Sequence, residues 1–275
     1  MRRMVTVLAA VAALTGCDGS ADTGTGDSGS GTASPSPSAS TSAAATPSPA
    51  PTGAQRIAEE TDLYLFEYSW PEAAGKQSEL AALLDQRMDH TKEQLVREST
   101  AARAAARQDG FPYNKHSYSA EWKVVTELPD WLSLSSQVST YGGGAHGMYG
   151  VDSLVWDKKN KTAISAIDLF SSPADLEAAV KDRFCSDLDK QRKEKRGDEA
   201  SPNAIEEFDK CPGIAELVVL VGSSNRRQFN RLTLYAGPYV AGPYVEGAYL
   251  VDLPVTKAVV AAVKPEYQGF FAARN

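Results

Sequence analysis

Hydrophobic and polar residues alternate in several short stretches of this chain, and that alternation predicts β-strands. In residues 62–70 aromatic side chains occupy every second position, so a pleated strand would present them on one face. These side chains are Tyr64, Phe66, Tyr68 and Trp70. We interpret the aromatic stripe as core packing rather than as a ligand platform.

The same alternation continues further along the chain. Residues 118–128 and 131–138 alternate on either side of Pro129-Asp130, which predicts an antiparallel hairpin, and residues 151–156 predict a third strand. Towards the C-terminus, strands are expected at residues 217–221, 229–235 and 249–253, followed by a short helix over residues 255–263. Strands and helices arrive in blocks, which favours an α+β fold with mainly antiparallel sheets and packed helices.

Two longer stretches follow the helical period. Between Gly75 and Gly110 apolar residues recur at spacings of four and seven, which predicts a long amphipathic helix that ends at Gly110. Ser172-Pro173-Ala174-Asp175 combines a cap, a first-turn proline and an early acid, and predicts the start of a second helix. We interpret the basic residues in its last turns as partners of the helix dipole. They are Lys190, Arg192, Lys193, Lys195 and Arg196.

The N-terminus has the pattern of a secreted lipoprotein. Arg2 and Arg3 precede an apolar run over residues 4–14, and the run ends in Leu14-Thr15-Gly16-Cys17. This pattern predicts a signal peptide over residues 1–16 and a lipid on Cys17, because the cysteine follows small residues at a cleavage box. The apolar run is much shorter than the ~20 residues that a membrane-spanning helix needs.

Residues 17–55 are then expected to form a disordered tether. From residue 18 to 54 they contain Gly, Ser, Thr, Ala, Pro and a few Asp, with no aromatic residue, and bury too little apolar area to fold. The protein is therefore expected to be a membrane-anchored lipoprotein outside the cytoplasm, in the periplasm or on the outer cell surface. The formal net charge of −7 argues against nucleic acid and favours a cationic partner.

The chain contains three cysteines, and the lipid accounts for one of them. Cys185 and Cys211 are left as a pair in an oxidising compartment, where we expect a disulfide that stabilises the fold by ~3 kcal/mol. Neither has a His or a second Cys at metal-ligand spacing, so no metal site is expected.

A glycine-rich segment at residues 140–147 is the first candidate binding loop. Successive glycines allow positive φ and a close backbone approach, which suits either a tight strand connection or a cradle for something small. Its candidate contact residues are Tyr141, Gly143, Gly144 and His146. The chain lacks the Gly-x-Ser-x-Gly, His-Glu-x-x-His and Walker motifs, so we assign no catalytic residue and no cofactor.

Residues 236–249 are the second candidate. Gly237-Pro238 and Gly242-Pro243 force turns, and each pair is followed by a tyrosine, Tyr239 or Tyr244. Tyrosine combines an apolar ring with a polar tip, as at many contact surfaces. A kinked strand connection whose tyrosines pack inward explains the segment equally well.

These segments resemble a known family. The motifs are Tyr141-Gly142-Gly143-Gly144-Ala145-His146-Gly147, Ile167-Asp168-Leu169-Phe170 and, after the tyrosine turns, Val251-Asp252-Leu253-Pro254. They resemble the paired extracytoplasmic domains of RsiV anti-sigma factors and of the N-terminal part of PdaC-type peptidoglycan deacetylases. Gly142 stands where that family usually has threonine. The resemblance implies a PdaC-type domain over residues 56–164, an RsiV-type domain with the disulfide over residues 165–264, and a tail over residues 265–275.

The resemblance also limits the function. In the RsiV branch this ectodomain binds lysozyme, while a separate cytoplasmic segment retains the sigma factor; in the deacetylase branch, catalysis belongs to another domain. We expect neither of those parts here. The leading hypothesis is a non-enzymatic envelope module that binds an extracytoplasmic protein, for example a lysozyme-like one, or wall glycan. The alternatives are a peptidoglycan hydrolase that uses His146 as acid or base, and a purely structural envelope lipoprotein.

Overall fold

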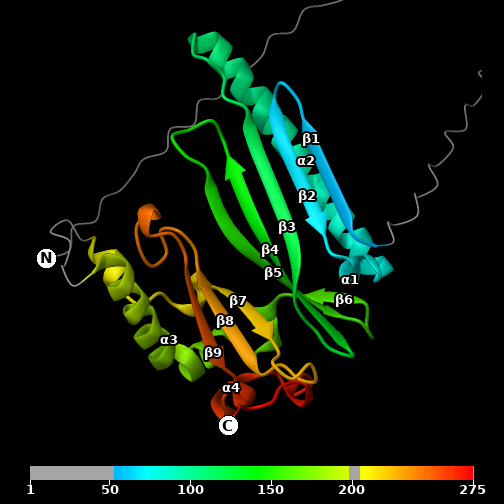
Figure 1. Ribbon diagram of the computed structural model, residues 1–275, viewed down its shortest axis with the longest axis vertical. Coiled ribbons are helices and arrows are strands. Elements are labelled where there is room, and N and C mark those ends of the chain that lie inside the picture. Colours follow the sequence, from blue (N-terminus) through cyan, green and yellow to red (C-terminus); the bar gives the residue numbers. More distant parts are fainter. Residues whose placement is uncertain (1–52, 198–204, 275) are drawn as a thin grey trace, which may run out of the picture. The chain divides into compact units, whose positions relative to one another are not determined.

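The computed structural model describes residues 53–197 and 205–274 and contains two β-sheets (Figure 1). The larger sheet has six strands in the order β1-β2-β3-β4-β5-β6. The strands are β1 (Gln55–Glu60), β2 (Tyr64–Trp70), β3 (His116–Glu127), β4 (Trp131–Tyr141), β5 (Met148–Asp157) and β6 (Thr162–Ile164). The predicted aromatic strand, hairpin and third strand are confirmed, whereas β1 and β6 were not predicted.

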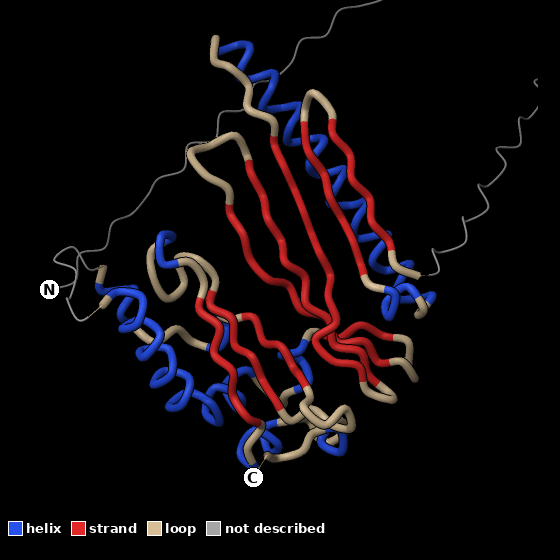
Figure 2. Tube along the Cα trace, in the orientation of Figure 1, coloured by secondary structure: helices blue, strands red, loops and turns tan. Residues whose placement is uncertain are grey.

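Helices α1 (Glu72–Gly75) and α2 (Ser78–Asp109) connect β2 to β3. This long crossover makes β2 and β3 parallel, while the other neighbouring strands of the sheet are antiparallel. Helix α2 runs along one face of the sheet over β1, β2 and β3, as Figure 2 shows. It ends at Gly110, which adopts the left-handed conformation at φ 75°, as the helical pattern predicted.

The aromatic stripe of β2 fills the core between α2 and the sheet. Its exposed fractions run from 0% at Phe66 to 6% at Tyr64, so the interpretation as core packing is confirmed. The helix contributes Leu80, Leu84, Met88 and Leu95 to the same core. Burial of this apolar face, rather than helix propensity alone, stabilises the long α2.

The smaller sheet is antiparallel and has the order β7-β8-β9. Its strands are β7 (Val218–Gly222), β8 (Arg231–Ala236) and β9 (Tyr249–Pro254), and its helices are α3 (Pro173–Arg196) and α4 (Lys257–Ala262). Short 3-10 helices occur at Ala166–Leu169, Glu206–Asp209, Ile214–Glu216, Tyr244–Glu246 and Gln268–Phe270. The α+β class with mainly antiparallel sheets is therefore confirmed.

A second core joins the two sheets. Leu154 and Trp156 of β5 face α2, whereas Val155 between them faces the smaller sheet, because successive strand residues point to opposite faces. Trp131 at the start of β4 packs against Phe229 and Phe270, with ring centroids 6.3 and 5.1 Å apart. The described residues thus form one compact unit, and the boundary of the two domains between residues 164 and 165 stays a prediction.

Helix α3 begins and is cross-linked as the sequence predicts. The Ser172 hydroxyl accepts a hydrogen bond from the Asp175 backbone N–H at 3.1 Å, which is the N-cap interaction. Cys185 of α3 forms the expected disulfide with Cys211, and their Cα atoms are 5.6 Å apart. The bond ties the middle of α3 to the segment that precedes β7.

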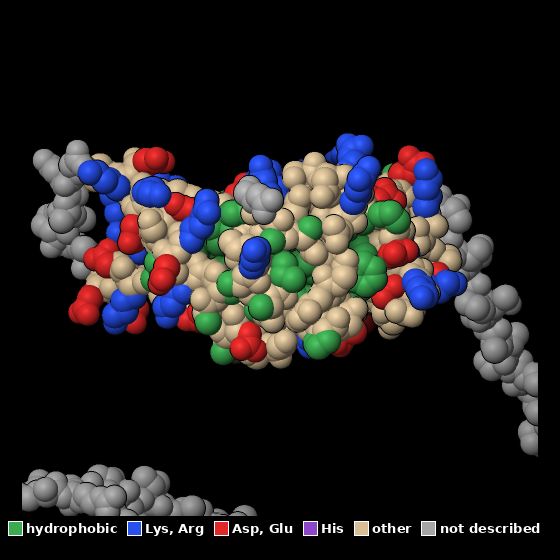
Figure 3. Space-filling model, turned by 90° about the horizontal axis from the view of Figure 1, so that it is seen from below, with side chains coloured by type: hydrophobic (Ala, Val, Ile, Leu, Met, Phe, Trp, Pro, Cys, Tyr) green, Lys and Arg blue, Asp and Glu red, His purple; other side chains and the backbone are tan. Residues whose placement is uncertain are grey.

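Some predictions fall outside the described residues. The signal peptide at residues 1–16, the lipid on Cys17 and nearly all of the tether are among them. Within the described ranges, no helix has the length and the apolar character needed to cross a bilayer. Figure 3 shows one face of the molecule, on which acidic and basic side chains are interspersed with apolar ones.

Candidate binding surface

The two candidate loops, which are far apart in the sequence, meet in the structure. The β4–β5 loop carries His146, and the β8–β9 connection carries Tyr239 and Tyr244. The imidazole ring of His146 stacks on the ring of Tyr244, with centroids 4.2 Å apart and an interplanar angle of 29°. The Tyr244 hydroxyl donates to the Gly147 carbonyl at 2.9 Å, which fastens one loop to the other.

The hydrogen bonds of His146 define the tautomer of its ring. Nδ1 lies 2.9 Å from the Gly147 carbonyl oxygen, and since a carbonyl can only accept, Nδ1 carries the proton. Nε2 then accepts from the Tyr239 hydroxyl at 3.4 Å. Both ring nitrogens are therefore engaged by neutral oxygens and not by a carboxylate.

The glycine-rich loop is held at its own base. Gly143 adopts φ 82°, a left-handed conformation that favours glycine. Its carbonyl accepts from the Asn114 side chain at 3.1 Å, and the Gly144 carbonyl accepts from the Tyr141 hydroxyl at 2.9 Å. Tyr141 therefore orders the loop, whereas His146 is exposed at the end of the loop.

The tyrosines of the β8–β9 connection take different positions. Tyr239 has a φ of 69°, unusual for a residue other than glycine, and is 47% exposed. Tyr244 is half-buried between His146 and Tyr149, and its ring centroid is 6.0 Å from that of Tyr149. Tyr249 is 1% exposed. Tyr249 thus packs inward, whereas Tyr239 is exposed and Tyr244 half-buried, and a role of these two in binding stays a prediction.

Apolar side chains extend this surface. Val245, which follows Tyr244 in the chain, is 90% exposed, and Tyr149 on β5 is 39% exposed. Together with His146, Tyr239 and Tyr244 they form what we term the His146 surface. Exposed apolar groups gathered around ordered aromatic rings are typical of sites that contact a partner.

The basic end of α3 holds the β8–β9 connection in place. The Lys195 ammonium donates to the carbonyls of Glu246 and Ala248 at 2.8 and 2.7 Å. Arg192, which is 5% exposed, donates through Nε to the Ala241 carbonyl at 3.0 Å. Arg192 and Lys195 thus have partners in another segment, which the helix-dipole interpretation did not include.

Arg196 and Glu246 form the polar centre of this support. Two nitrogens of the Arg196 guanidinium donate to the two Glu246 oxygens at 2.9 and 3.1 Å, and Nη1 donates to Asp209 at 2.7 Å. Tyr249 donates its hydroxyl proton to Glu246 as well. The carboxylate raises the pKa of Arg196, while burial, together with the hydrogen bond to Glu246, raises the pKa of Tyr249 to about 12.

The disulfide stabilises a segment that Arg192 of α3 contacts. Arg192 Nη2 donates to the Lys210 carbonyl at 2.8 Å, next to Cys211. The bridge to Cys185 therefore fixes the segment whose carbonyls Arg192 binds. Among the described residues, no group of three or more His, Cys, Asp or Glu side chains is placed to hold a metal ion.

These observations describe an α+β module with an ordered, exposed aromatic surface. Residues 57–149 match the family model described as deacetylase PdaC, which confirms the resemblance for that part of the chain. This range includes the β4–β5 loop with His146. The RsiV-type assignment of residues 165–264 stays a prediction.

Two solved structures are similar to this chain. A member of the DUF3298 family from Bacteroides fragilis is 15% identical, with a TM-score of 0.48, and the alignment covers 80% of this chain and 98% of that one. A DUF3298 family protein from Pseudomonas aeruginosa is 16% identical, with a TM-score of 0.42 and coverages of 82% and 98%. The comparison with curated proteins finds no match.

Proposed function

We propose that this protein is a lipid-anchored, non-enzymatic module of the cell envelope that binds an extracytoplasmic protein through the His146 surface. The stacking of His146 on Tyr244 beside the 90% exposed Val245 carries this proposal. An interface needs apolar and aromatic side chains that are already ordered before binding, because ordering them on binding costs affinity. Here hydrogen bonds hold the rings in place, and so do the contacts that Arg192, Lys195 and Arg196 at the end of α3 make with the β8–β9 connection.

Binding explains this geometry better than hydrolysis does. A general acid or base needs a proton path to the substrate, and a catalytic histidine is commonly oriented by a carboxylate. The two nitrogens of His146 instead meet the Gly147 carbonyl and the Tyr239 hydroxyl. The ring thus acts as a flat contact group.

The expected partner is a cationic protein, for example a lysozyme-like one. The formal net charge of the chain is −7, and charge of opposite sign accelerates association and favours the correct partner. A lipid on Cys17 would confine the module to the outside of a membrane, where such proteins act. Fatty-acid labelling of the wild type and of Cys17→Ser tests the anchor separately.

The binding test compares three ligands with the full chain. Lysozyme is titrated against it, with cytochrome c as a basic protein of a different fold and purified peptidoglycan as the glycan ligand. We expect lysozyme to bind, and the Tyr239→Ser and Val245→Ser variants to weaken binding at least about tenfold, as truncation of interface anchors does. Phe111→Ser is the matched control, because Phe111 is 71% exposed but lies before β3, outside the His146 surface.

Three results would contradict the protein-binding proposal. The first is the absence of lysozyme binding at low salt, where charge attraction is strongest. The second is equal binding of cytochrome c, which would indicate charge attraction alone. The third is retention on peptidoglycan only, which would favour the glycan alternative.

A further inference from the structure

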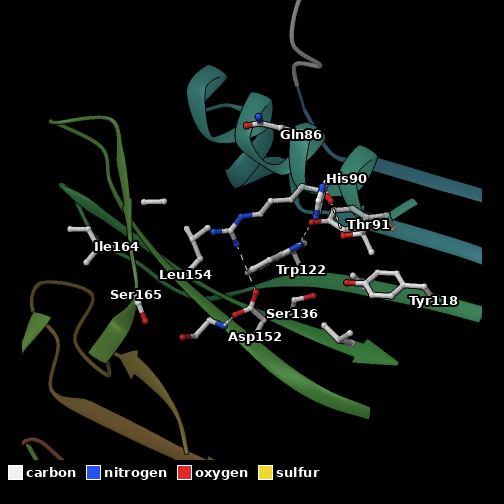
Figure 4. Close-up of a pocket in the computed structure, with 16 residues that line it drawn as sticks. Gln86, His90, Thr91, Tyr118, Trp122, Ser136, Asp152, Leu154, Ile164 and Ser165 are labelled. Carbon is white, nitrogen blue, oxygen red and sulfur yellow. Dashed lines mark hydrogen bonds and ion pairs between the residues drawn. The ribbon is translucent and has the colours of Figure 1, made fainter. Parts of the chain in front are cut away.

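A second, separate site lies between α2 and the uncovered part of the larger sheet. Helix α2 packs over β2 and β3, so the neighbouring face of β4 and β5 is left open beside it. There the structure has a cavity of about 580 Å³ (Figure 4). That volume lies within the ~300–1,000 Å³ typical of small-ligand sites.

Two apolar side chains form the floor of the cavity. Trp122 and Leu154 are 4% and 1% exposed, and both line the cavity. The Trp122 indole N–H donates to the Tyr68 hydroxyl at 2.9 Å, which fixes the plane of the ring. A ligand would therefore meet a preformed aromatic and aliphatic floor.

Opposite charges face each other across that floor. The guanidinium of Arg87 on α2 lies over the Trp122 ring, 5.9 Å from its centroid, and Arg87 Nη1 lies 3.8 Å from Asp152 Oδ2 on β5. The two side chains are 41% and 57% exposed. Such a long, solvated ion pair contributes only about 0–1 kcal/mol, so a ligand could replace it at little cost.

Further polar groups surround the floor, and one of them has an unmet hydrogen bond. Ser136 is completely buried and lines the cavity, and its hydroxyl has no hydrogen-bond partner among the described residues. A buried hydroxyl without a partner is costly. Gln86, Thr91 and Ser165 also line the cavity and add an amide and two hydroxyls.

From this arrangement we infer that the cavity binds a neutral saccharide. Asp152 would repel an anion and Arg87 would repel a cation, while a purely apolar ligand would bury polar groups without partners. A sugar offers both donors and acceptors for the charged and amide side chains, and its C–H face could take the place of the Arg87 guanidinium over the Trp122 ring. This site is distinct from the His146 surface, and the inference does not depend on the proposed protein partner.

The test titrates chitotriose and cellotriose against the full chain and follows tryptophan fluorescence and calorimetric heat. We expect at least one of the two sugars to bind, and Arg87→Gln and Asp152→Ala each to weaken that binding at least about fivefold. Arg97→Gln is the matched control, since Arg97 is on the same helix and is likewise 3.8 Å from its carboxylate partner, Glu93. The control should change binding less than about twofold.

Failure of both sugars to bind the wild type would overturn the inference. The inference would also be wrong if Arg87→Gln or Asp152→Ala kept the affinity for the sugar within about fivefold of wild type. It would be wrong as well if Arg97→Gln weakened sugar binding as much as these variants do. Tyr239→Ser should leave sugar binding unchanged, because Tyr239 is outside the cavity. Loss of lysozyme binding with intact sugar binding, or the reverse, would separate the two proposals.

Discussion

The imidazole of His146 and the phenol ring of Tyr244 are stacked at 4.2 Å, and this contact joins the two loops that carry the His146 surface. The hydrogen bond from the Tyr244 hydroxyl to the Gly147 carbonyl also joins these two loops. Neither loop contributes a metal ligand set or a carboxylate to the ring of His146. The shape of the ring, rather than its acid–base chemistry, is therefore expected to matter.

Two substitutions of His146 separate these roles. His146→Phe keeps a flat ring on Tyr244, so lysozyme binding should stay within about threefold of wild type, whereas His146→Ala removes the stack and should weaken it at least about tenfold. Titration calorimetry of both variants measures the difference. Equal loss in the two variants would mean that the ring nitrogens are needed, as the hydrolase alternative requires.

Glu246→Gln should destabilise the protein, because Glu246 joins the β8–β9 connection to Arg196 at the end of α3. The Glu246 side chain is 14% exposed and accepts from Arg196 and Tyr249, so its neutralisation leaves a partly buried guanidinium with weaker partners. We expect a loss of ~1–3 kcal/mol in the free energy of unfolding, measured in urea. Lysozyme binding should fall as well, since Tyr244 and Val245 directly precede this residue.

Glu207→Gln is the control for that substitution. Glu207 also pairs with a basic residue, Lys210, at 3.2 Å, but its side chain is 76% exposed. Its replacement should change the free energy of unfolding by less than about 0.5 kcal/mol. A comparable loss in both variants would show that Glu246 does not act through its buried contacts.

The sequence predicts most elements of this fold because each of them buries only one of its faces. The strict alternation in β2 and the four- and seven-residue spacing in α2 follow directly from a single buried face, and both were confirmed. Strand β1 was missed because it is an edge strand of polar character, Gln-Arg-Ile-Ala-Glu-Glu, in which half of the positions are exposed. Its pairing with β2 is a tertiary contact without a local pattern.

Long-range contacts account for the other differences between the predictions from sequence and the structure. The basic residues of α3 suited a helix-dipole role locally, but Lys195 and Arg196 also bind the carbonyl and the carboxylate of Glu246 in another segment. Arg87 and Asp152 were not singled out, since a helix position and a strand position carry no sign that they face each other. The candidate loops themselves were found from glycine and tyrosine content, whereas their contact was not predictable.

Reduction of the Cys185–Cys211 disulfide should lower stability. The bond spans 26 residues, and a cross-link of that span restricts the unfolded chain by about 2–4 kcal/mol. Urea unfolding with and without a reductant measures the loss. The double variant Cys185→Ser/Cys211→Ser should be equally destabilised and insensitive to reductant; sensitivity in that variant would assign the effect to something other than this bond.

Alkaline pH should destabilise the fold through three tyrosines. Burial raises the pKa of Tyr68 to about 12, burial and the hydrogen bond to Glu246 do the same for Tyr249, and the hydrogen bond to Glu59 does so for Tyr64. In the unfolded chain a tyrosine titrates near ~10. Because the folded state prefers the neutral phenol, this stabilisation is complete below pH ~10 and is lost as the pH rises towards ~12.

Absorbance of the phenolate at 295 nm tests this prediction. A late group of tyrosines should titrate near pH 12, and Tyr68→Phe should remove one phenol from it. Titration of all tyrosines in one step near pH ~10 in the folded protein would contradict the prediction.

Gly247→Ala should disturb the His146 surface through the backbone and through Tyr149, without replacing any of the side chains that form that surface. Gly247 has φ 71° and ψ −156°, a region that is essentially restricted to glycine, and a Cβ there would lie 3.0 Å from the Tyr149 hydroxyl oxygen. The substitution should cost on the order of 1–3 kcal/mol and weaken lysozyme binding, because Tyr149 packs against Tyr244. Gly144→Ala is the matched control in the facing loop, where a Cβ meets nothing within 4 Å, and it should change stability by less than about 0.5 kcal/mol. If urea unfolding found the two variants equally stable, the conformation of the β8–β9 connection would not be what holds Tyr244 in place.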